Sequence, residues 1–172
     1  MEKKRKEIVL AGGCFWGLER YLEEIKGVEK TEVGYANGKT ADPTYQEVCQ
    51  LDTGHAETVK VVYDPEEITL KRLLSFYFKV IDPTSLNKQG NDIGTQYRTG
   101  IYYVDEKDRA VIIEAIQELQ KEYEKPIAIE IIELDNYFKA EEYHQKYLNK
   151  HPMGYCHIGK EWFEYAKKSS DQ

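Results

Sequence analysis

The chain has 172 residues, and its 24 basic and 31 acidic side chains give a formal net charge of −7. This acidic balance disfavours nucleic acids and anionic membranes as partners, and the length suits one domain that buries about 70% of its unfolded surface. Three cysteines without a Cys-x-x-Cys pair fit free thiols in a reducing compartment, so we expect a cytoplasmic protein.

The first residues of the chain share features with a lipoprotein signal peptide, because basic residues within 1–6 precede an apolar run and Cys14. The apolar run covers only residues 8–11, whereas the core of a signal peptide has roughly 7 to 15 apolar residues. No run approaches the about 20 apolar residues of a membrane span. We therefore expect neither a signal peptide nor a membrane anchor.

The first predicted elements meet at Cys14. Residues 8–11 are typical of a short buried strand, and the apolar residues within 15–26 recur at helical spacing. Gly12 and Gly13 would allow a tight turn between them, because glycine adopts positive φ at little cost. Cys14 is therefore expected in the first helical turn, where free N–H groups and the helix dipole favour a thiolate and lower its pKa from about 8.5.

Phe15 and Trp16 follow Cys14 directly, so a thiolate there would lie beside an apolar surface suited to an uncharged substrate group. The same pattern also fits a buried, unreactive cysteine in a glycine-hinged turn with two core aromatic residues. The local spacing alone does not decide between these interpretations.

Residues 28–36 and 55–63 are predicted strands, and residues 37–53 between them are expected to be a loop that carries Tyr45 and Cys49. In the second strand, one face consists of alternate residues, namely His55, Glu57, Val59, Val61 and Tyr63. A carboxyl group on this apolar face would have a raised pKa and could act as a general acid. Alternatively, Glu57 is solvated at the start of the strand or paired with His55.

A helix is predicted at residues 69–80, followed by a polar, glycine-containing loop at residues 82–98. Loops of this length inside a compact domain are often functional, and Asp92 and Tyr97 are the candidate groups. Each also has a structural interpretation, because Asp92 could form an Asx turn and Tyr97 could be the first packed residue of the next strand.

The remaining predicted elements are a strand at 99–104, a helix at 106–123, a strand at 127–134, a helix at 140–149 and an irregular, mobile tail at 150–172 that carries Cys156. The resulting β-α-β-β-α-β-α-β order predicts an α+β fold, a two-layer sandwich with a mixed sheet, flanking helices and long loops, similar to the ferredoxin-like class. Without a repeat or linker, residues 1–172 are predicted to form one domain.

The motifs, taken together, resemble those of the A-type peptide methionine sulfoxide reductases along nearly the whole chain. The matching segments are GCFWG at 13–17, Tyr45 with EVC at 47–49, GHAE at 54–57, QGNDIGTQYR at 89–98 and GYC at 154–156. The resemblance implies thiol-dependent reduction of methionine S-sulfoxide, free and in proteins, and thus repair of oxidised proteins.

The resemblance also implies a catalytic or binding role for each candidate site residue. Cys14 would be the nucleophile that attacks the sulfoxide sulfur, and Phe15 and Trp16 would surround the S-methyl group. Glu57 would protonate the sulfoxide oxygen, which is a poor leaving group until it is protonated. The remaining expected site residues are the phenol donors Tyr45 and Tyr97 and the organising carboxylate Asp92.

Turnover, by the same resemblance, leaves Cys14 as a sulfenic acid, which Cys156 converts to a disulfide for external reduction by thioredoxin. No metal, flavin or nucleotide is expected. Many relatives carry two tail cysteines, whereas Cys156 is the only one in this tail, so the Cys14–Cys156 bond would be the one that thioredoxin meets. Cys49 is expected to be a buried thiol without a catalytic role, and the protein is expected to be a monomer.

Three other interpretations use the same residues. A thiol peroxidase would also need a low-pKa cysteine and a resolving thiol, and it would turn over hydrogen peroxide. A structural zinc module would use Cys14, Cys49, Cys156 and His157, although paired-ligand spacing is missing. A non-catalytic module that binds sulfoxides would keep the pocket but leave Cys14 with an ordinary thiol pKa.

Overall fold

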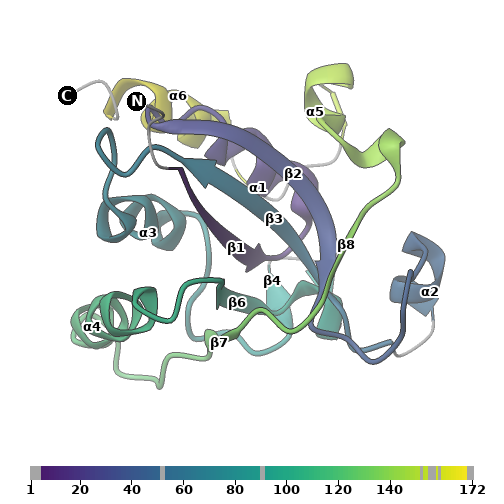
Figure 1. Cartoon of the computed structure of the whole chain (residues 1–172), viewed down its shortest axis with the longest axis horizontal. Helices are drawn as coiled ribbons and strands as arrows, with labels where there is room; N and C mark the ends of the chain where they lie inside the picture. The colour runs from purple at the N-terminus through teal and green to yellow at the C-terminus, as the bar shows by residue number, and fades with distance from the viewer. Residues whose placement is uncertain are drawn as a thin grey trace.

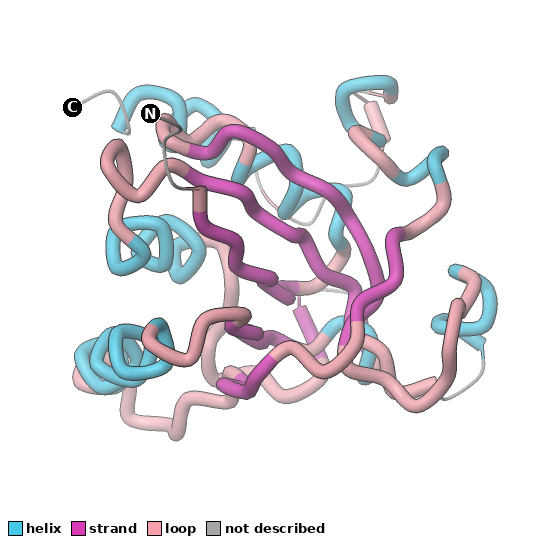
Figure 2. The backbone as a smooth tube through the Cα atoms, in the orientation of Figure 1, coloured by secondary structure: helices cyan, strands magenta, loops and turns pink. Residues whose placement is uncertain are grey.

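A computed structural model of the chain describes residues 5–50, 53–89, 92–151, 153–154, 158 and 160–169. Its centre is a curled, mixed sheet, drawn as arrows in Figure 1 and in magenta in Figure 2. The strands of this sheet are β1 (Lys6–Gly12), β2 (Val28–Ala36), β3 (Ala56–Tyr63), β6 (Thr99–Tyr103), β7 (Glu130–Glu133) and β8 (Tyr137–Lys139).

The strand order is β7-β6-β1-β3-β2-β8, and all neighbours are antiparallel except β6 and β7, which are parallel. A separate two-stranded sheet pairs β4 (Lys88–Gln89) with β5 (Asp92–Ile93). The predicted α+β class and the mixed sheet are confirmed. The two-layer, ferredoxin-like description stays a prediction.

The α-helices within the described residues are α1 (Phe15–Leu22), α2 (Tyr45–Gln50), α3 (Leu70–Lys79), α4 (Asp108–Gln120), α5 (Tyr147–Lys150) and α6 (Lys160–Ser169). Two 3₁₀ turns, η1 (Thr95–Tyr97) and η2 (Glu142–His144), complete the regular structure. No helix of the described residues is both long and apolar enough to cross a membrane.

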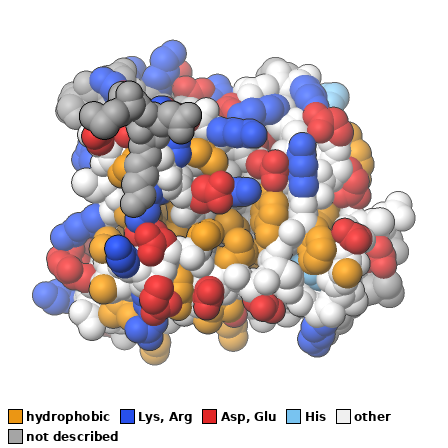
Figure 3. All heavy atoms as spheres, viewed as in Figure 1, with side chains coloured by type: hydrophobic (Ala, Val, Ile, Leu, Met, Phe, Trp, Pro, Cys, Tyr) orange, Lys and Arg blue, Asp and Glu red, His pale blue; other side chains and the backbone are white. Residues whose placement is uncertain are grey.

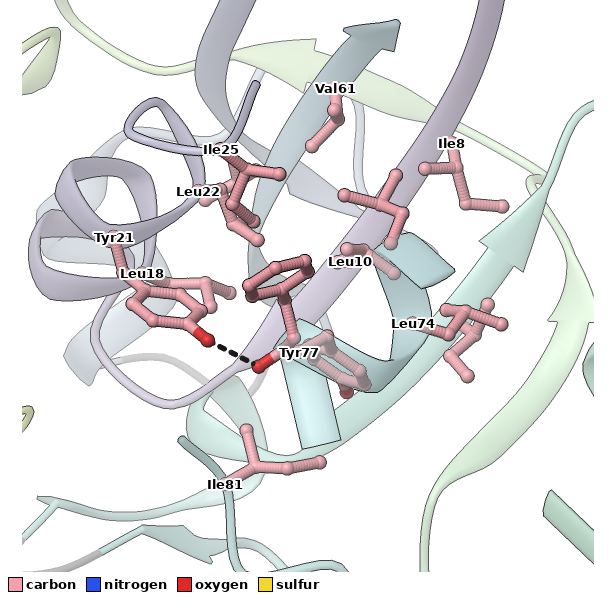
Figure 4. Packing of buried hydrophobic residues seen from close by; sticks show 14 of the residues in the cluster. Ile8, Leu10, Leu18, Tyr21, Leu22, Ile25, Val61, Leu74, Tyr77 and Ile81 are labelled. Atoms are coloured by element: carbon pink, nitrogen blue, oxygen red, sulfur yellow. Dashed lines mark hydrogen bonds between the residues drawn. The ribbon is translucent and has the colours of Figure 1, made fainter. Parts of the chain in front are cut away.

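The main hydrophobic core lies between one face of the sheet and the helices α1, α3, α4 and α6. Strand β1 alternates strictly: Ile8 and Leu10 belong to this core, whereas Val9 and Ala11 belong to a smaller cluster on the opposite face. Figure 4 shows Leu18 and Leu22 of α1 opposite the side chains of β1. Helix α1 is thus fixed on the sheet along its apolar stripe.

The opposite face of the sheet is less thickly covered. Its small cluster is completed by Leu134 and Tyr137, which are partly buried. Figure 3 looks onto this side and shows hydrophobic side chains gathered over the strands in the middle of the molecule. The candidate site residues Cys14 and Glu57 lie instead near the end of β1 and the beginning of β3, on the side of the sheet that α1 covers.

Several sequence predictions were wrong in detail. Residues 37–53 are not all loop, because α2 forms at residue 45. Its signal was present in the sequence as a capping box, in which Thr44 N–H donates to the Glu47 carboxylate and Glu47 N–H donates to Thr44 Oγ1. The strand expected at 127–134 is shorter, β8 was missed, and α1 ends at residue 22 rather than 26.

The predicted helix at 140–149 is also wrong, because Lys146 adopts a left-handed backbone conformation with φ +55° between η2 and α5. The tail is not irregular throughout either. Helix α6 packs against the core through the fully buried Ala166 and through Phe163, whose ring lies 5.1 Å from the Arg20 guanidinium carbon. The amphipathic pattern of residues 160–169 stabilises this helix by burying one face.

Tyr77 of α3 connects this helix to the end of β1 and to β6, so removal of its hydroxyl should destabilise the fold. Its buried hydroxyl donates to the Ala11 carbonyl at 2.5 Å and lies 3.3 Å from the Gly100 carbonyl. We expect Tyr77→Phe to lower the free energy of unfolding by about 1 kcal/mol, measured by urea denaturation. The matched control is Tyr63→Phe, because the buried Tyr63 hydroxyl has no hydrogen-bond partner within the described residues. Equal losses in both variants would contradict the assignment.

Candidate functional site

The turn between β1 and α1 places Cys14 at the helix N-terminus. Gly13 has φ +83°, a conformation that favours glycine, whereas Gly12 is a regular strand residue. Gly12 serves close packing, since a Cβ atom there would lie 2.9 Å from Ile81 Cγ2. Cys14 is the N-cap residue of α1 and is 6% exposed, so its sulfur lies next to the positive end of the helix dipole.

Glu57 reaches the same helix N-terminus from β3. The Phe15 backbone N–H donates to Glu57 Oε1 at 3.2 Å, and the Glu57 side chain is 1% exposed. Burial raises the pKa of Glu57 to about 8, the Phe15 hydrogen bond opposes this rise, and the charge of Asp92 adds to it. The predicted burial of Glu57 on the apolar face is confirmed, and the solvated alternative is wrong.

Aromatic rings form a wall beside Cys14. The Phe15 ring centroid lies 5.7 Å from that of Tyr35 and 6.4 Å from that of Tyr45. The Trp16 indole stacks on Tyr147 with centroids 3.8 Å apart and planes 12° apart. Phe15 is fully buried, whereas Trp16 is only partly buried, so one ring belongs to the core and the other reaches the surface of the site.

His144 lies in the middle of these rings. Its Nδ1 accepts a hydrogen bond from Trp16 Nε1–H at 2.9 Å, and its ring centroid lies 4.4 Å from that of Tyr45. Burial lowers the pKa of His144, while the charge of Glu141 opposes this effect. A neutral imidazole that accepts at Nδ1 carries its proton on Nε2, so His144 fixes the indole only in the neutral form.

Glu141 anchors two aromatic residues of the site through one carboxylate. Its Oε1 accepts from the Tyr35 hydroxyl at 2.7 Å, and its Oε2 accepts from the Tyr45 backbone N–H at 2.9 Å. Burial alone would raise the pKa of Glu141, but the hydrogen bonds from Tyr45 and Tyr35 lower it below its usual value. Glu141 is therefore charged at neutral pH and sets the position of the first residue of α2.

The two candidate phenols lie near Glu57. Burial, together with the charge of Glu57, raises the pKa of both Tyr45 and Tyr97, so both hydroxyls keep their protons at neutral pH. Asp92 acts on the same groups, because its charge raises the pKa of Glu57 and of Tyr97. The structure thus brings Cys14, Glu57 and the two phenols into one electrostatic neighbourhood.

Cys49 differs from the prediction. It is exposed rather than buried, because α2 turns Val48 toward the core and the next side chain outward. Partial burial of the thiol by neighbouring residues still raises its pKa, although hydrogen bonds with Tyr45, Gln96 and Tyr97 oppose this rise. Its lack of a catalytic role stays a prediction. Cys156 and His157 lie outside the described residues.

Sequence reasoning missed His144, Glu141, Tyr147 and Tyr35 as site residues. Residues 140–149 were interpreted as one helix, so the 3₁₀ turn η2 and the left-handed Lys146, which set the positions of these side chains, were not foreseen. The local pattern gave no warning, because Ala140, Tyr143, Tyr147 and Leu148 recur at helical spacing. Tyr35 lies within the strand predicted at residues 28–36, but its pairing opposite Glu57 follows only from the register of β2 and β3.

One group of acidic residues in the described chain could hold a metal ion. Ligand atoms of Glu29, Asp64 and Glu67 lie within 4.8 Å of one another. Glu29 and Asp64 also pair with Arg5, so a cation of the protein already offsets part of the charge of this group. Cys14 and Glu57 are not part of it.

Comparison with known proteins identifies the family. A family model described as peptide methionine sulfoxide reductase matches residues 6–171. The chain belongs to this family. A peptide methionine sulfoxide reductase MsrA of Lachnoclostridium phytofermentans is 58% identical over 164 residues, covering 95% of this chain and 99% of the relative. One of Clostridium perfringens is 60% identical over 153 residues, covering 89% and 98%.

Solved structures of the family agree with the fold. Reduced Mxr1 from Saccharomyces cerevisiae has a TM-score of 0.85 at 42% identity and covers 89% of each chain. Methionine sulfoxide reductase A of Corynebacterium diphtheriae has a TM-score of 0.81 at 38% identity, covering 90% of this chain and 79% of the other. The chain is thus a peptide methionine sulfoxide reductase of the MsrA type, which reduces methionine sulfoxide.

The hydrogen bond between Trp16 and His144 gives a test of the aromatic wall in this reductase. His144→Phe keeps a ring of similar size but leaves the indole N–H without its acceptor, at a cost of about 1 to 3 kcal/mol. We expect kcat/KM for methionine sulfoxide to fall about tenfold, because the indole loses its fixed orientation. The control is Tyr143→Phe, which changes an exposed neighbour. An unchanged kcat/KM in His144→Phe would show that the indole is held by stacking alone.

Proposed function

We propose that Cys14 reduces methionine S-sulfoxide, free and in proteins, by direct attack of its thiolate on the sulfoxide sulfur. Oxygen passes to Cys14 as a sulfenic acid, and methionine leaves. The observation that carries this proposal is the buried carboxyl of Glu57, which is hydrogen-bonded to the backbone of the residue after Cys14. The preference for the S epimer is taken from the family, and the biological role would be repair of oxidised proteins.

Glu57 is proposed as the general acid. With a pKa of about 8, its carboxyl is mostly protonated at pH 7. Oε1 accepts the Phe15 N–H, so the proton belongs on Oε2, which is buried and has no hydrogen-bond partner within the described residues. That oxygen can therefore donate to a sulfoxide oxygen as negative charge develops on it.

The other site residues would position and polarise the substrate. Tyr45 and Tyr97, whose raised pKa values keep them protonated, would donate hydrogen bonds to the sulfoxide oxygen. Phe15 and Trp16 would hold the S-methyl group against apolar ring surface. Asp92 would organise this arrangement electrostatically and help to keep Glu57 protonated.

Regeneration is proposed to proceed through Cys156. Its thiol would condense with the Cys14 sulfenic acid, releasing water and forming a disulfide. Thioredoxin would then reduce this disulfide, and no bound cofactor is required. Support comes from Mxr1 of Saccharomyces cerevisiae, which has been solved in complex with Trx2 and has a TM-score of 0.61 to this chain at 30% identity, covering 86% of this chain and 87% of the other. We also propose a single-domain, cytoplasmic monomer.

The two cysteines should fail in different ways. Cys14→Ser should abolish methionine formation because the attacking thiolate is gone. Cys156→Ser should produce about one methionine per enzyme and then stall with thioredoxin, because the sulfenic acid cannot reach a disulfide. Rapid-quench assays that count methionine per enzyme distinguish these results. Repeated thioredoxin-driven turnover in Cys156→Ser would refute the resolving role, and turnover of hydrogen peroxide but not of sulfoxide would indicate a peroxidase.

The Glu57 proton can be tested by substitution and by pH. Glu57→Gln keeps the shape but cannot protonate the oxygen, so the single-turnover rate should fall by about 10² to 10⁴. In the wild type the rate should fall as pH rises through about 8, because the acid form is present below the pKa and lost above it. Asp92→Asn should shift this alkaline fall to lower pH, since one cause of the raised pKa is removed. A loss below threefold in Glu57→Gln would exclude the role.

A further inference from the structure

Met153 belongs to the residue type whose oxidised form this family reduces. The sequence contains two methionines, Met1 and Met153, and the Met153 side chain is 89% exposed, more than any other large hydrophobic residue described. An exposed thioether is readily oxidised by peroxides to a sulfoxide. The product of that damage belongs to the chemical class that this family reduces.

The turn that carries Met153 lies against the aromatic wall of the site. Gly154 N–H donates to the His151 carbonyl at 2.8 Å, which closes the turn. A Cβ atom on Gly154 would lie 2.9 Å from Tyr147 Cε1, so the backbone beside Met153 is in contact with that ring. Tyr147 in turn stacks on Trp16 at 3.8 Å. One aromatic layer therefore separates the Met153 turn from the indole beside Cys14.

Helix α5, which leads into this turn, is tied to α1, the helix that begins after Cys14. Lys146 N–H donates to Glu19 at 2.8 Å, and Lys146 Nζ donates to Glu23 at 2.6 Å. Asn149 Nδ2 donates to the other oxygen of Glu23 at 2.6 Å. These contacts hold α5, and therefore the chain that leads to Met153, beside the helix that positions the nucleophile.

We propose that Met153 is an intramolecular substrate: after oxidation by a peroxide, it is reduced by Cys14 of its own chain. The inference rests on the proposed function of Cys14. A peroxide transfers one oxygen atom to the Met153 sulfur and leaves as water or an alcohol. The Cys14 thiolate attacks that sulfur while Glu57 protonates the sulfoxide oxygen. The oxygen then passes to the Cys14 sulfur: the S–O bond to Met153 and the transient S–S bond break, a new S–O bond forms on Cys14 as a sulfenic acid, and Met153 regains its thioether. Cys156 and an external dithiol complete the two-electron cycle.

Reaction within one chain is favoured by the sequence spacing. In the proposed function, Cys156 comes to Cys14, and three residues of extended chain span at most about 11 Å, so the movement that delivers Cys156 also brings Met153 near the site. A group attached by a short segment has an effective concentration in roughly the millimolar range. A sulfoxide on a second copy would compete poorly with one attached to the same chain.

Mass spectrometry of the full chain tests this directly. The Cys14–Cys156 disulfide is first formed with methionine sulfoxide, which shields both thiols, and hydrogen peroxide is then added to oxidise Met153. After catalase treatment, dithiothreitol starts the reaction, and the tryptic peptide 151–160 is followed for loss of one oxygen, which fragment ions assign to Met153. About half of the added oxygen should disappear, because a peroxide makes both epimers and an A-type enzyme reduces one.

Two controls make the result decisive. Cys14→Ser should keep all of the oxygen on Met153, and Met153→Leu should reduce free methionine sulfoxide as the wild type does. The rate constant should be the same at low and high enzyme concentration, and a rate that rises with concentration would overturn the intramolecular assignment. If the wild type reduces free methionine sulfoxide but leaves Met153 oxidised, the inference fails while the proposed function stands. Failure with both substrates would refute the proposed function itself.

Discussion

The site depends on the hydrogen bond from the Phe15 backbone N–H to Glu57, which joins residues 42 positions apart. It forms because β1 and β3 are neighbours and because Glu57 faces the side of the sheet that α1 covers. The helix N-terminus favours negative charge on both Cys14 and Glu57. For Glu57 burial outweighs this effect and raises its pKa to about 8, so the same helix end can hold a thiolate beside a neutral acid.

The two sides of the site are built differently. The nucleophile and the acid belong to the rigid core, where Tyr77 fixes the end of β1 through the Ala11 carbonyl. The aromatic wall also includes His144 and Tyr147, which lie in short turns held by polar contacts such as that between Glu19 and the Lys146 backbone. The groups that react are thus fixed by the core, whereas part of the surface that contacts the substrate is held by separate hydrogen bonds. This arrangement suits an enzyme whose substrates have only the oxidised methionine side chain in common.

Predictions from the sequence were correct where the local pattern of residues determines the structure. The strand period placed Glu57 on the buried face, and the glycine turn placed Cys14 at a helix start, since both depend on neighbours within a few residues. The predicted helix at residues 140–149 was wrong because Lys146 adopts a left-handed backbone conformation there. This conformation is accompanied by a hydrogen bond from the Lys146 N–H to Glu19, which lies 127 positions earlier in the chain. His144 was missed for the same reason, because its role depends on tertiary contacts that no local period encodes.

The different roles of two carboxyl groups follow from their burial and from their hydrogen bonds, because Glu57 is buried whereas Glu141 is only half-buried. Both carboxyl groups bear on Tyr45: Glu141 accepts a hydrogen bond from the Tyr45 backbone, and Glu57, when ionised, raises the pKa of the Tyr45 phenol. Glu141 accepts from Tyr35 and Tyr45, and its pKa is lowered despite burial. Among the described residues, Glu57 accepts a hydrogen bond only from Phe15, and burial dominates its pKa. Donors stabilise the charged form of a carboxyl group, so the richly bonded one becomes an anchor and the sparsely bonded one keeps the proton that the reaction requires.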